Sequence, residues 1–167
     1  MRRYPWLLLF LVAVTGCGAG SGGVESEACT EIGAPTGVGV DVAAPIAGKV
    51  TGGTLEVCWD GECVRRDLQL MNSTEAGDTT CTGDGPTDAC SAQLGENGRK
   101  NAFVDVQNLP QAPVRATLTL TGADGQVLQQ EAEATPAATY PNGPDCPPGG
   151  VQAHLVVDAS GSVQQRD

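Results

Sequence analysis

Cysteine is the residue type in this chain with the widest choice of chemistry. The 167 residues include seven cysteines, and a cysteine can bind zinc, form a disulfide, act as a nucleophile or carry a lipid. Zinc sites commonly use close pairs such as Cys-x-x-Cys, but four residues separate Cys58 from Cys63 and eight separate Cys81 from Cys90. This spacing favours disulfides over zinc if the chain is exported to an oxidising compartment.

The N-terminal segment predicts that export. Arg2 and Arg3 precede an apolar run from Trp6 to Val14, and the small residues Thr15 and Gly16 follow. This order is typical of a secretory signal peptide, and the apolar run is far shorter than the roughly 20 residues of a transmembrane helix. A cysteine, Cys17, stands directly after Thr15 and Gly16. The motif Val14-Thr15-Gly16-Cys17 resembles the lipobox of bacterial lipoproteins, and the resemblance covers about the first twenty residues.

The resemblance implies a lipid anchor on Cys17. A signal peptide over residues 1–16 would be removed, and a diacylglycerol thioether would stand on the sulfur of Cys17. An anchor of two or three acyl chains binds a membrane stably, unlike a single chain. We therefore expect a protein attached through this lipid to the extracytoplasmic face of a cell membrane. Position 18 is Gly, whereas the usual signal that retains a lipoprotein in the inner membrane has Asp there. The sequence therefore leaves open which membrane the protein occupies in an organism that has two.

The six other cysteines form an even set, which in an exported chain predicts three disulfides. They are Cys29, Cys58, Cys63, Cys81, Cys90 and Cys146. Six cysteines allow fifteen pairings, and only one pair has a geometric argument behind it. A local bridge between Cys81 and Cys90 would then leave Cys29 with Cys146, but the sequence does not decide those two pairs.

The geometric argument rests on a hairpin turn at Asp60-Gly61. Asp-Gly between two strand-like segments is a strong signal for a two-residue type I′ turn. Counting outward places Cys58 opposite Cys63, Val57 opposite Val64 and Glu56 opposite Arg65, which pairs like with like and acid with base. The Cys58–Cys63 pair would be non-hydrogen-bonded, with Cα atoms about 4.5 Å apart. A direct bridge is feasible at that separation.

Catalysis has few candidate residues. The only histidine is His154, which alternates with Gln152 on the face of a strand opposite Ala153 and Leu155. It is therefore expected to be an exposed strand residue rather than a catalytic base. There is no Gly-x-Ser-x-Gly nucleophile elbow, and oxidised cysteines offer no thiolate. We expect a protein without enzymatic activity and without a cofactor.

Two further groups of residues are candidates for binding. Asp78, Asp84 and Asp88 share a Gly-rich segment and could supply oxygen ligands to calcium, but the regular Asp-x-Asp-x-Asp-Gly loop is missing. Solvated surface acids are the favoured interpretation of these three residues.

The second group is Trp59, Asp60 and Glu62 at the hairpin tip, which could anchor a glycan or protein. Trp59 alternates with Leu55 and Val57, so packing in the core or at its rim is the favoured interpretation for this side chain.

Short alternating segments separated by Gly, Pro, Asn and Asp predict an all-β domain. About seven strands indicate a small disulfide-stapled β-sandwich, immunoglobulin-like or fibronectin-like in outline. The expected strands are Val38–Val42, Thr54–Trp59, Glu62–Leu70, Asn101–Val106, Val114–Thr121, Val127–Ala134 and Val151–Asp158.

The other segments complete the expected organisation. Residues 17–28 are Gly- and Ser-rich and should form a flexible tether. The domain should occupy residues 29–158, with a long loop over 72–100 that lacks an apolar pattern, and residues 159–167 should form a polar tail. Between the strands at 114–121 and 127–134, a three-residue loop Ala123-Asp124-Gly125 would bring Leu120 opposite Leu128.

The net charge of the chain restricts the classes of partner that it is expected to bind. The formal net charge is -11, and removal of Arg2 and Arg3 with the signal peptide gives -11 - 2 = -13. The negative electrostatic field of so acidic a chain disfavours binding to nucleic acid and to anionic lipid. We expect a non-catalytic binding or structural module of the bacterial cell envelope, with an envelope protein or glycan as its partner. An accessory subunit of an envelope enzyme or transporter is the second hypothesis, and a secreted hydrolase-type enzyme is the third.

Overall fold

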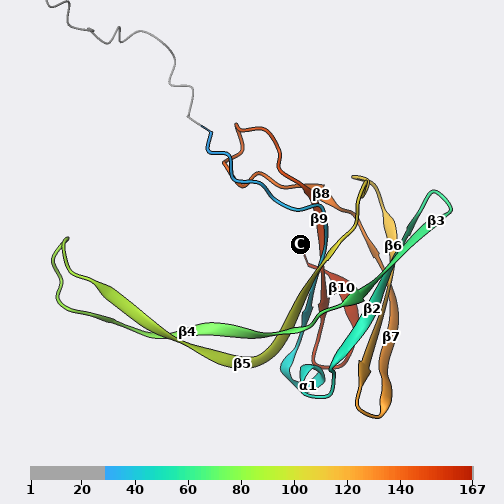
Figure 1. Cartoon of the computed structure of the whole chain (residues 1–167), viewed down its shortest axis with the longest axis horizontal. Helices are drawn as coiled ribbons and strands as arrows, with labels where there is room; N and C mark the ends of the chain where they lie inside the picture. The colour runs from blue at the N-terminus through green and yellow to red at the C-terminus, as the bar shows by residue number, and fades with distance from the viewer. Residues whose placement is uncertain (1–28, 167) are drawn as a thin grey trace, which may run out of the picture.

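The computed structural model describes residues 29–166, which fold into two β-sheets packed face to face (Figure 1). The larger sheet has the order β10-β9-β1-β5-β4, with β8 paired to β9. The smaller has the order β3-β2-β6-β7. The expected all-β sandwich with three disulfides is confirmed. Among the described residues, no helix is long and apolar enough to cross a membrane.

The larger sheet, here called sheet A, collects strands from both ends and the middle of the described residues. The pairing of β1 with β9 is parallel, and its other pairings are antiparallel. A parallel pair needs a long crossover, which the intervening strands supply. Its strands are β1 (Gly37–Val42), β4 (Met71–Cys81), β5 (Cys90–Asp105), β8 (Ala137–Ala138), β9 (Val151–Val157) and β10 (Val163–Gln165).

The smaller sheet, sheet B, consists of two hairpins joined along β2 and β6. Its strands are β2 (Gly52–Trp59), β3 (Glu62–Leu68), β6 (Val114–Gly122) and β7 (Gly125–Ala134). A single helical turn, α1 (Ala44–Ala47), lies between β1 and β2 and has a proline at its start. That is a position where the missing N–H of proline costs nothing.

The core lies between the sheets and is aliphatic. Inward-facing residues of β1, β6 and β9 alternate with outward-facing ones, and the most enclosed large side chains include Leu55, Leu118, Leu120 and Leu155, all at 0% exposure. No polar side chain is buried among the described residues. Burial of apolar surface at roughly 25 cal/mol per Å² therefore stabilises the domain, supplemented by the three disulfides.

Both predicted hairpin registers are present. Asp60 and Gly61 have φ of 49° and 82°, as a type I′ turn requires, and Cys58 pairs with Cys63 as counted. In the second hairpin Leu120 pairs with Leu128 as expected, but the loop prediction was wrong in one respect. Gly122 pairs with Gly125 across a two-residue turn, and a bulge at Val127 restores the register.

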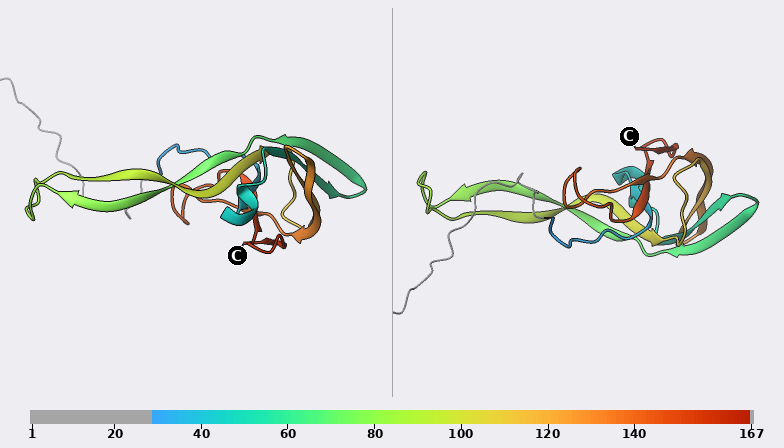
Figure 2. Two further views of the ribbon diagram at one scale, coloured as in Figure 1. Left: turned by 90° about the horizontal axis from the view of Figure 1, so that it is seen from below. Right: turned by 90° about the horizontal axis from the view of Figure 1, so that it is seen from above.

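The expected loop over residues 72–100 was wrong, because most of this segment forms the long hairpin of β4 and β5. The outer part of the hairpin, residues 73–98, is here called the arm; it projects from the sandwich in both further views (Figure 2). Every residue from 74 to 96 is exposed. A ribbon exposed on both faces needs no apolar alternation, so the sequence carries no periodic signal for its strands.

Two other expectations need correction. The polar tail expected over 159–167 contains β10, which pairs with the end of β9 through Val163 and Val157. Val163 is buried, and this one apolar contact was too short a pattern to predict a strand. The strand expected at Asn101–Val106 is the inner end of β5, which begins at Cys90.

Candidate functional site

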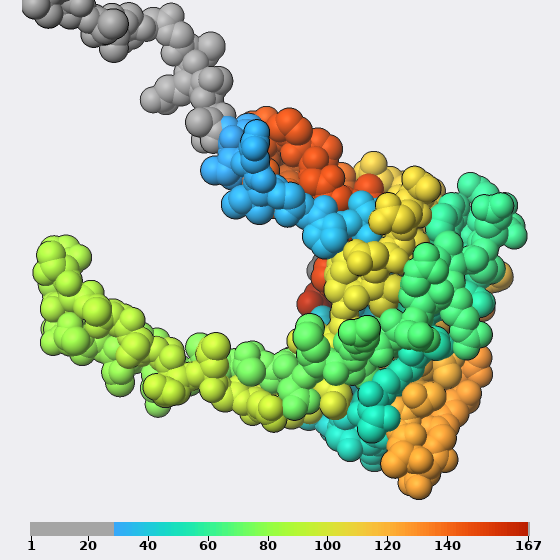
Figure 3. All heavy atoms as spheres, viewed as in Figure 1, coloured from blue at the N-terminus to red at the C-terminus, as the bar shows by residue number. Residues whose placement is uncertain are grey.

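The outer face of sheet A carries a shallow hollow of about 270 Å³. Its lining includes Asp41, Met71, Asn101, Phe103, His154 and Arg166. These residues come from β1, β4, β5, β9 and the residue after β10. The space-filling view shows the wider bay, between the arm and the lobe of residues 29–36 and 139–150 (Figure 3).

Two glycines of β1 form the floor of this face. Gly39 pairs with Phe103 on one side and with His154 on the other, so the three residues form one row across the sheet. A Cβ at Gly39 would overlap Nδ1 of His154. A Cβ at Gly37 would overlap the Val104 backbone oxygen and would lie 3.0 Å from Cε1 of Phe103. The two rings therefore lie over glycine backbone. Their position depends on the absence of side chains at Gly37 and Gly39.

His154 is consequently half-buried rather than fully exposed as predicted. The predicted alternation is confirmed, since Ala153 and Leu155 are buried and His154 lies on the other face. The prediction missed the packing of the imidazole over Gly39. That contact depends on the parallel pairing of β1 with β9, two strands more than a hundred residues apart.

A charged pair closes one side of the hollow. Arg166 Nη2 lies 2.6 Å from Asp41 Oδ2, and the Arg166 backbone N–H donates to the His154 carbonyl at 2.8 Å. The Asp41 side chain retains 26% of its exposure and the Arg166 side chain 49%. Partly exposed pairs of this kind contribute about 0–1 kcal/mol. The pair mainly gives this face one fixed cation beside a carboxylate.

The hollow can therefore recognise a ligand through a mixed surface. Phe103 and Met71 are 39% and 63% exposed, so both present apolar surface to the hollow. Asn101 donates through Nδ2 to the Ser73 hydroxyl at 2.7 Å. An aromatic ring, an imidazole, an amide and an ion pair on one face suit a flat polar ligand or a protein side chain.

The predicted candidates at the Asp60-Gly61 tip form a separate surface. Trp59 is half-buried and packs against the core, as the favoured interpretation stated, while Asp60 and Glu62 are exposed. A second hollow of about 310 Å³ lies beside them and reaches Arg115 and Glu133. The hairpin tip therefore forms one edge of this hollow, and Trp59 is not an isolated, fully exposed aromatic side chain.

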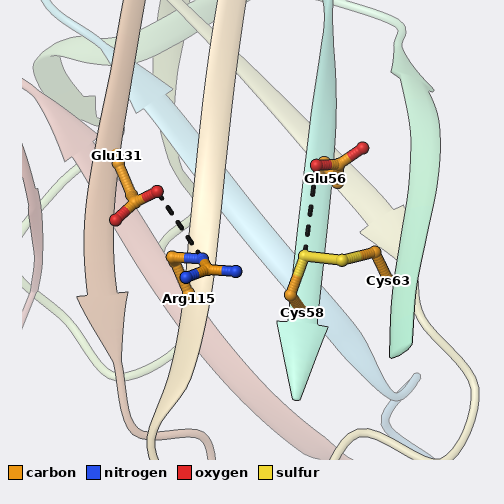
Figure 4. Close-up of polar contacts among 5 residues, drawn as sticks. All are labelled: Glu56, Cys58, Cys63, Arg115 and Glu131. Carbon is orange, nitrogen blue, oxygen red and sulfur yellow. Dashed lines mark hydrogen bonds and ion pairs between the residues drawn. A yellow bond between two sulfur atoms is a disulfide. The ribbon is translucent and has the colours of Figure 1, made fainter. Parts of the chain in front are cut away.

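The close-up of the outer side of sheet B shows the residues around the Cys58–Cys63 bridge (Figure 4). Glu56 Oε1 lies 4.0 Å from Sγ of Cys58, but a disulfide sulfur has no proton to donate, so this is a contact only. Arg115 Nε lies 3.6 Å from Glu131 Oε2 on the neighbouring strands, with both side chains exposed.

The same residues bear on metal binding. Glu56, Cys58 and Cys63 are the one set of possible ligands in residues 29–166 that lie close enough to share an ion. Both sulfurs are committed to the disulfide, so they are not thiolate ligands. The set does not make a zinc site.

The weak calcium candidates are held in other ways. Asp88 accepts a hydrogen bond from the Gly85 backbone N–H at 2.6 Å and another from the Thr82 hydroxyl at 3.3 Å. It therefore stabilises the turn at the end of the arm. Asp78 lies in β4. Within residues 29–166, Asp78, Asp84 and Asp88 do not form a group whose oxygen atoms lie close enough together to share one ion.

The disulfides join Cys29 to Cys146, Cys58 to Cys63 and Cys81 to Cys90. The first of these ties the start of the described chain to the lobe before β9, where Asn142 also accepts a hydrogen bond from the Ile32 N–H at 3.1 Å and donates one to its carbonyl at 2.9 Å. The third closes the end of the arm. Cys17, the predicted lipidation residue, lies outside the described residues.

Comparison with known proteins gives no relative from which to transfer a function. No protein-family model, curated protein or solved structure matches this chain.

Proposed function

We propose that this chain is a non-catalytic binding module of the bacterial cell envelope, held at the extracytoplasmic face of a membrane by lipid on Cys17. The proposal joins the lipobox-like motif at Val14–Cys17 to a domain that contains three disulfides. Disulfides persist in oxidising compartments outside the cytoplasm. The module would therefore act on the outer side of the membrane that carries it.

The arm is the observation that carries the binding part of the proposal. An isolated two-stranded ribbon is marginally stable in water, yet this one is closed by its own disulfide and extends away from the core with residues 74–96 exposed. The packing of the sandwich core does not require it. A projecting element of this kind provides surface for a partner, which favours the accessory-subunit form of the proposal.

The Cys29–Cys146 bridge supports one orientation of the domain relative to the membrane. It fastens the entry of the chain to the lobe of residues 29–36 and 139–150, so a tether leading to Cys17 would leave the domain at that lobe. The bay and the arm would then face partners near the membrane. The hypothesis of a hydrolase can be tested by replacing Asp41 and His154, whose side chains line the same hollow.

The test has an anchoring part and a binding part, both done in a bacterium that processes lipoproteins. Wild type should sediment with membranes and carry lipid mass on Cys17, whereas Cys17→Ser should carry no lipid and should not be both cleaved and membrane-bound. A photo-reactive residue at Gln93 of the arm should cross-link to a discrete envelope component, whereas one at Gln130 of sheet B should not. The proposal fails if Cys17→Ser is cleaved and membrane-bound just as wild type is, or if photo-reactive residues at Gln93 of the arm and at Met71 of the hollow both yield no cross-link.

A further inference from the structure

The arm has an empty strand position beside β5. Strand β1 pairs with β5 only from Lys100 to Asp105, where Val42 is opposite Lys100. Beyond that point β1 ends and the chain turns into α1, so residues 90–99 of β5 have β4 on one side and, in the described chain, no strand on the other. A strand added there would continue the line of β1 along the arm.

The β5 edge is better suited to pairing than the β4 edge. Two irregularities interrupt the β4–β5 ladder, and at the outer one Gly77 and Asp78 of β4 stand opposite Gln93 alone. The extra residue therefore lies in β4, which bends that edge and discourages pairing. From Cys90 to Glu96 the β5 strand itself is uninterrupted, and seven residues extend roughly 20 Å.

The inner end of this free edge is bounded by the fold. Gly98 lies against α1, where a Cβ at Gly98 would be 3.4 Å from the Ala44 Cβ. Its φ of 74° marks a local irregularity in β5. The pairing-competent edge therefore runs from Cys90 to Glu96 and stops before α1.

The two faces of the edge differ in chemistry. Leu94 pairs with Ala76 and Ala92 pairs with Thr79, so these side chains share one face with the Cys81–Cys90 bridge. Leu94 is 72% exposed, the highest value among the large hydrophobic residues described. A partner strand would meet an apolar strip on this face and Ser91 and Gln93 on the other.

The charge of the arm selects the partner. Residues 72–98 contain five carboxylates and no Lys or Arg; the five are Glu75, Asp78, Asp84, Asp88 and Glu96. Like charges at close range oppose pairing of two arms, so a second copy of this chain is the wrong occupant. A basic segment complements the field and would be steered toward it.

We propose that an extended basic segment of a protein partner adds as a strand along the free β5 edge from Cys90 to Glu96. Backbone hydrogen bonds would supply affinity, and alternate side chains would supply specificity. Apolar residues of the segment lie over Leu94 and Ala92 on one face, and lysine or arginine residues lie on the other face with Glu75. Glu96, at the inner end of the apolar face, adds to the negative field. This inference deepens the proposed binding function and rests on it.

The probe is a short peptide of alternating lysine and valine, titrated into the isotope-labelled full chain carrying Cys17→Ser with its disulfides intact. Amide shifts should be concentrated at residues 90–96, and binding should weaken as salt rises. Glu75→Gln and Glu96→Gln should each weaken binding by about two- to fivefold. Leu94→Ser should weaken it, while Ile32→Ser, at another exposed apolar residue, and Glu133→Gln should leave it unchanged.

A second peptide isolates the strand pairing. The same sequence N-methylated at alternate residues cannot donate backbone hydrogen bonds to the edge and should lose binding. The inference is overturned if this peptide binds as well as the first, if a glutamate–valine peptide binds equally, or if neither basic peptide binds. Concentration-dependent self-association through residues 90–96 would also overturn it in favour of a second copy.

One result separates this inference from the proposed function. Shifts confined to Gly39, Phe103 and His154 would place binding in the bay, which removes the arm pairing and leaves the binding module intact. Retention of a cleaved Cys17→Ser chain in membranes would instead remove the anchoring proposal and leave the peptide result unaffected.

Discussion

Cys29 and Cys146 are 117 positions apart in the chain, yet their Cα atoms lie 5.7 Å apart across a disulfide. The Cys58–Cys63 bridge, by contrast, spans a sequence separation of 5. In the chain-entropy description, a bridge restricts the unfolded chain more when it closes a longer loop. The two bridges should therefore differ in their effect on stability.

Removal of the long bridge should destabilise the domain more than removal of the short one. We expect the pair Cys29→Ser with Cys146→Ser to lower the free energy of unfolding by about 4–5 kcal/mol, and the pair Cys58→Ser with Cys63→Ser by about 2 kcal/mol. Urea denaturation monitored by circular dichroism measures both. Equal losses, or a larger loss for the short bridge, would contradict the chain-entropy account.

Gly39 should tolerate a side chain only when His154 is shortened. Gly39→Ala places a Cβ against the imidazole and should cost about 1–3 kcal/mol, and adding His154→Ala should recover much of this loss. Gly53→Ala provides the comparison, because its Cβ would overlap the Thr119 backbone oxygen, which no side-chain truncation relieves. A double-mutant cycle that shows no coupling between positions 39 and 154 would refute the packing of the ring over the glycine.

The β2–β3 hairpin, the Gly39–His154 contact and the arm show how far the fold and the candidate site could be predicted from the sequence. The β2–β3 hairpin was predictable because Asp60-Gly61 defines both the turn and the register. The Gly39–His154 contact was not, because it depends on a parallel pairing of distant strands that no local pattern announces. The arm was missed since its strands bury no face and so show no period-two pattern. A local Cys81–Cys90 bridge at its end was one possible pairing, but the sequence did not decide it.

The turn between β9 and β10 should weaken in acid. The pKa of Asp158 is lowered from its usual 3.8, first by the hydrogen bond from the Ser160 hydroxyl and then by that from the Ser162 backbone N–H. A carboxyl with a lowered folded-state pKa stabilises the fold above 3.8 and loses that effect as the pH falls through the lower value.

Asp158→Ala should therefore be less stable than wild type at neutral pH, and the difference should shrink below about pH 4. Urea denaturation of both proteins across this range measures it. Asp124→Ala, in the turn between β6 and β7, removes an acid from another surface turn and serves as the control. A stability difference for Asp158→Ala that is constant down to about pH 2 would show that the charge is not involved.

The Cys81–Cys90 bridge should stabilise the arm without stabilising the sandwich. Residues 74–96 contribute no buried side chain, so Cys81→Ser with Cys90→Ser should increase amide hydrogen exchange in the arm. Exchange of core amides in β1, β6 and β9 should stay unchanged. Loss of core protection in this variant would mean that the arm is coupled to the sandwich, contrary to its exposure.

The central claim, a lipid-anchored module on the extracytoplasmic face, is tested most directly at Cys17. The measurement is the mass of the N-terminal peptide of the protein recovered from bacterial membranes. We expect a peptide that begins at Cys17 and carries the mass of a diacylglyceryl group, with or without an additional acyl chain on its amino group. A peptide that begins at another residue, or an unmodified Cys17 in the membrane-bound protein, would contradict the claim.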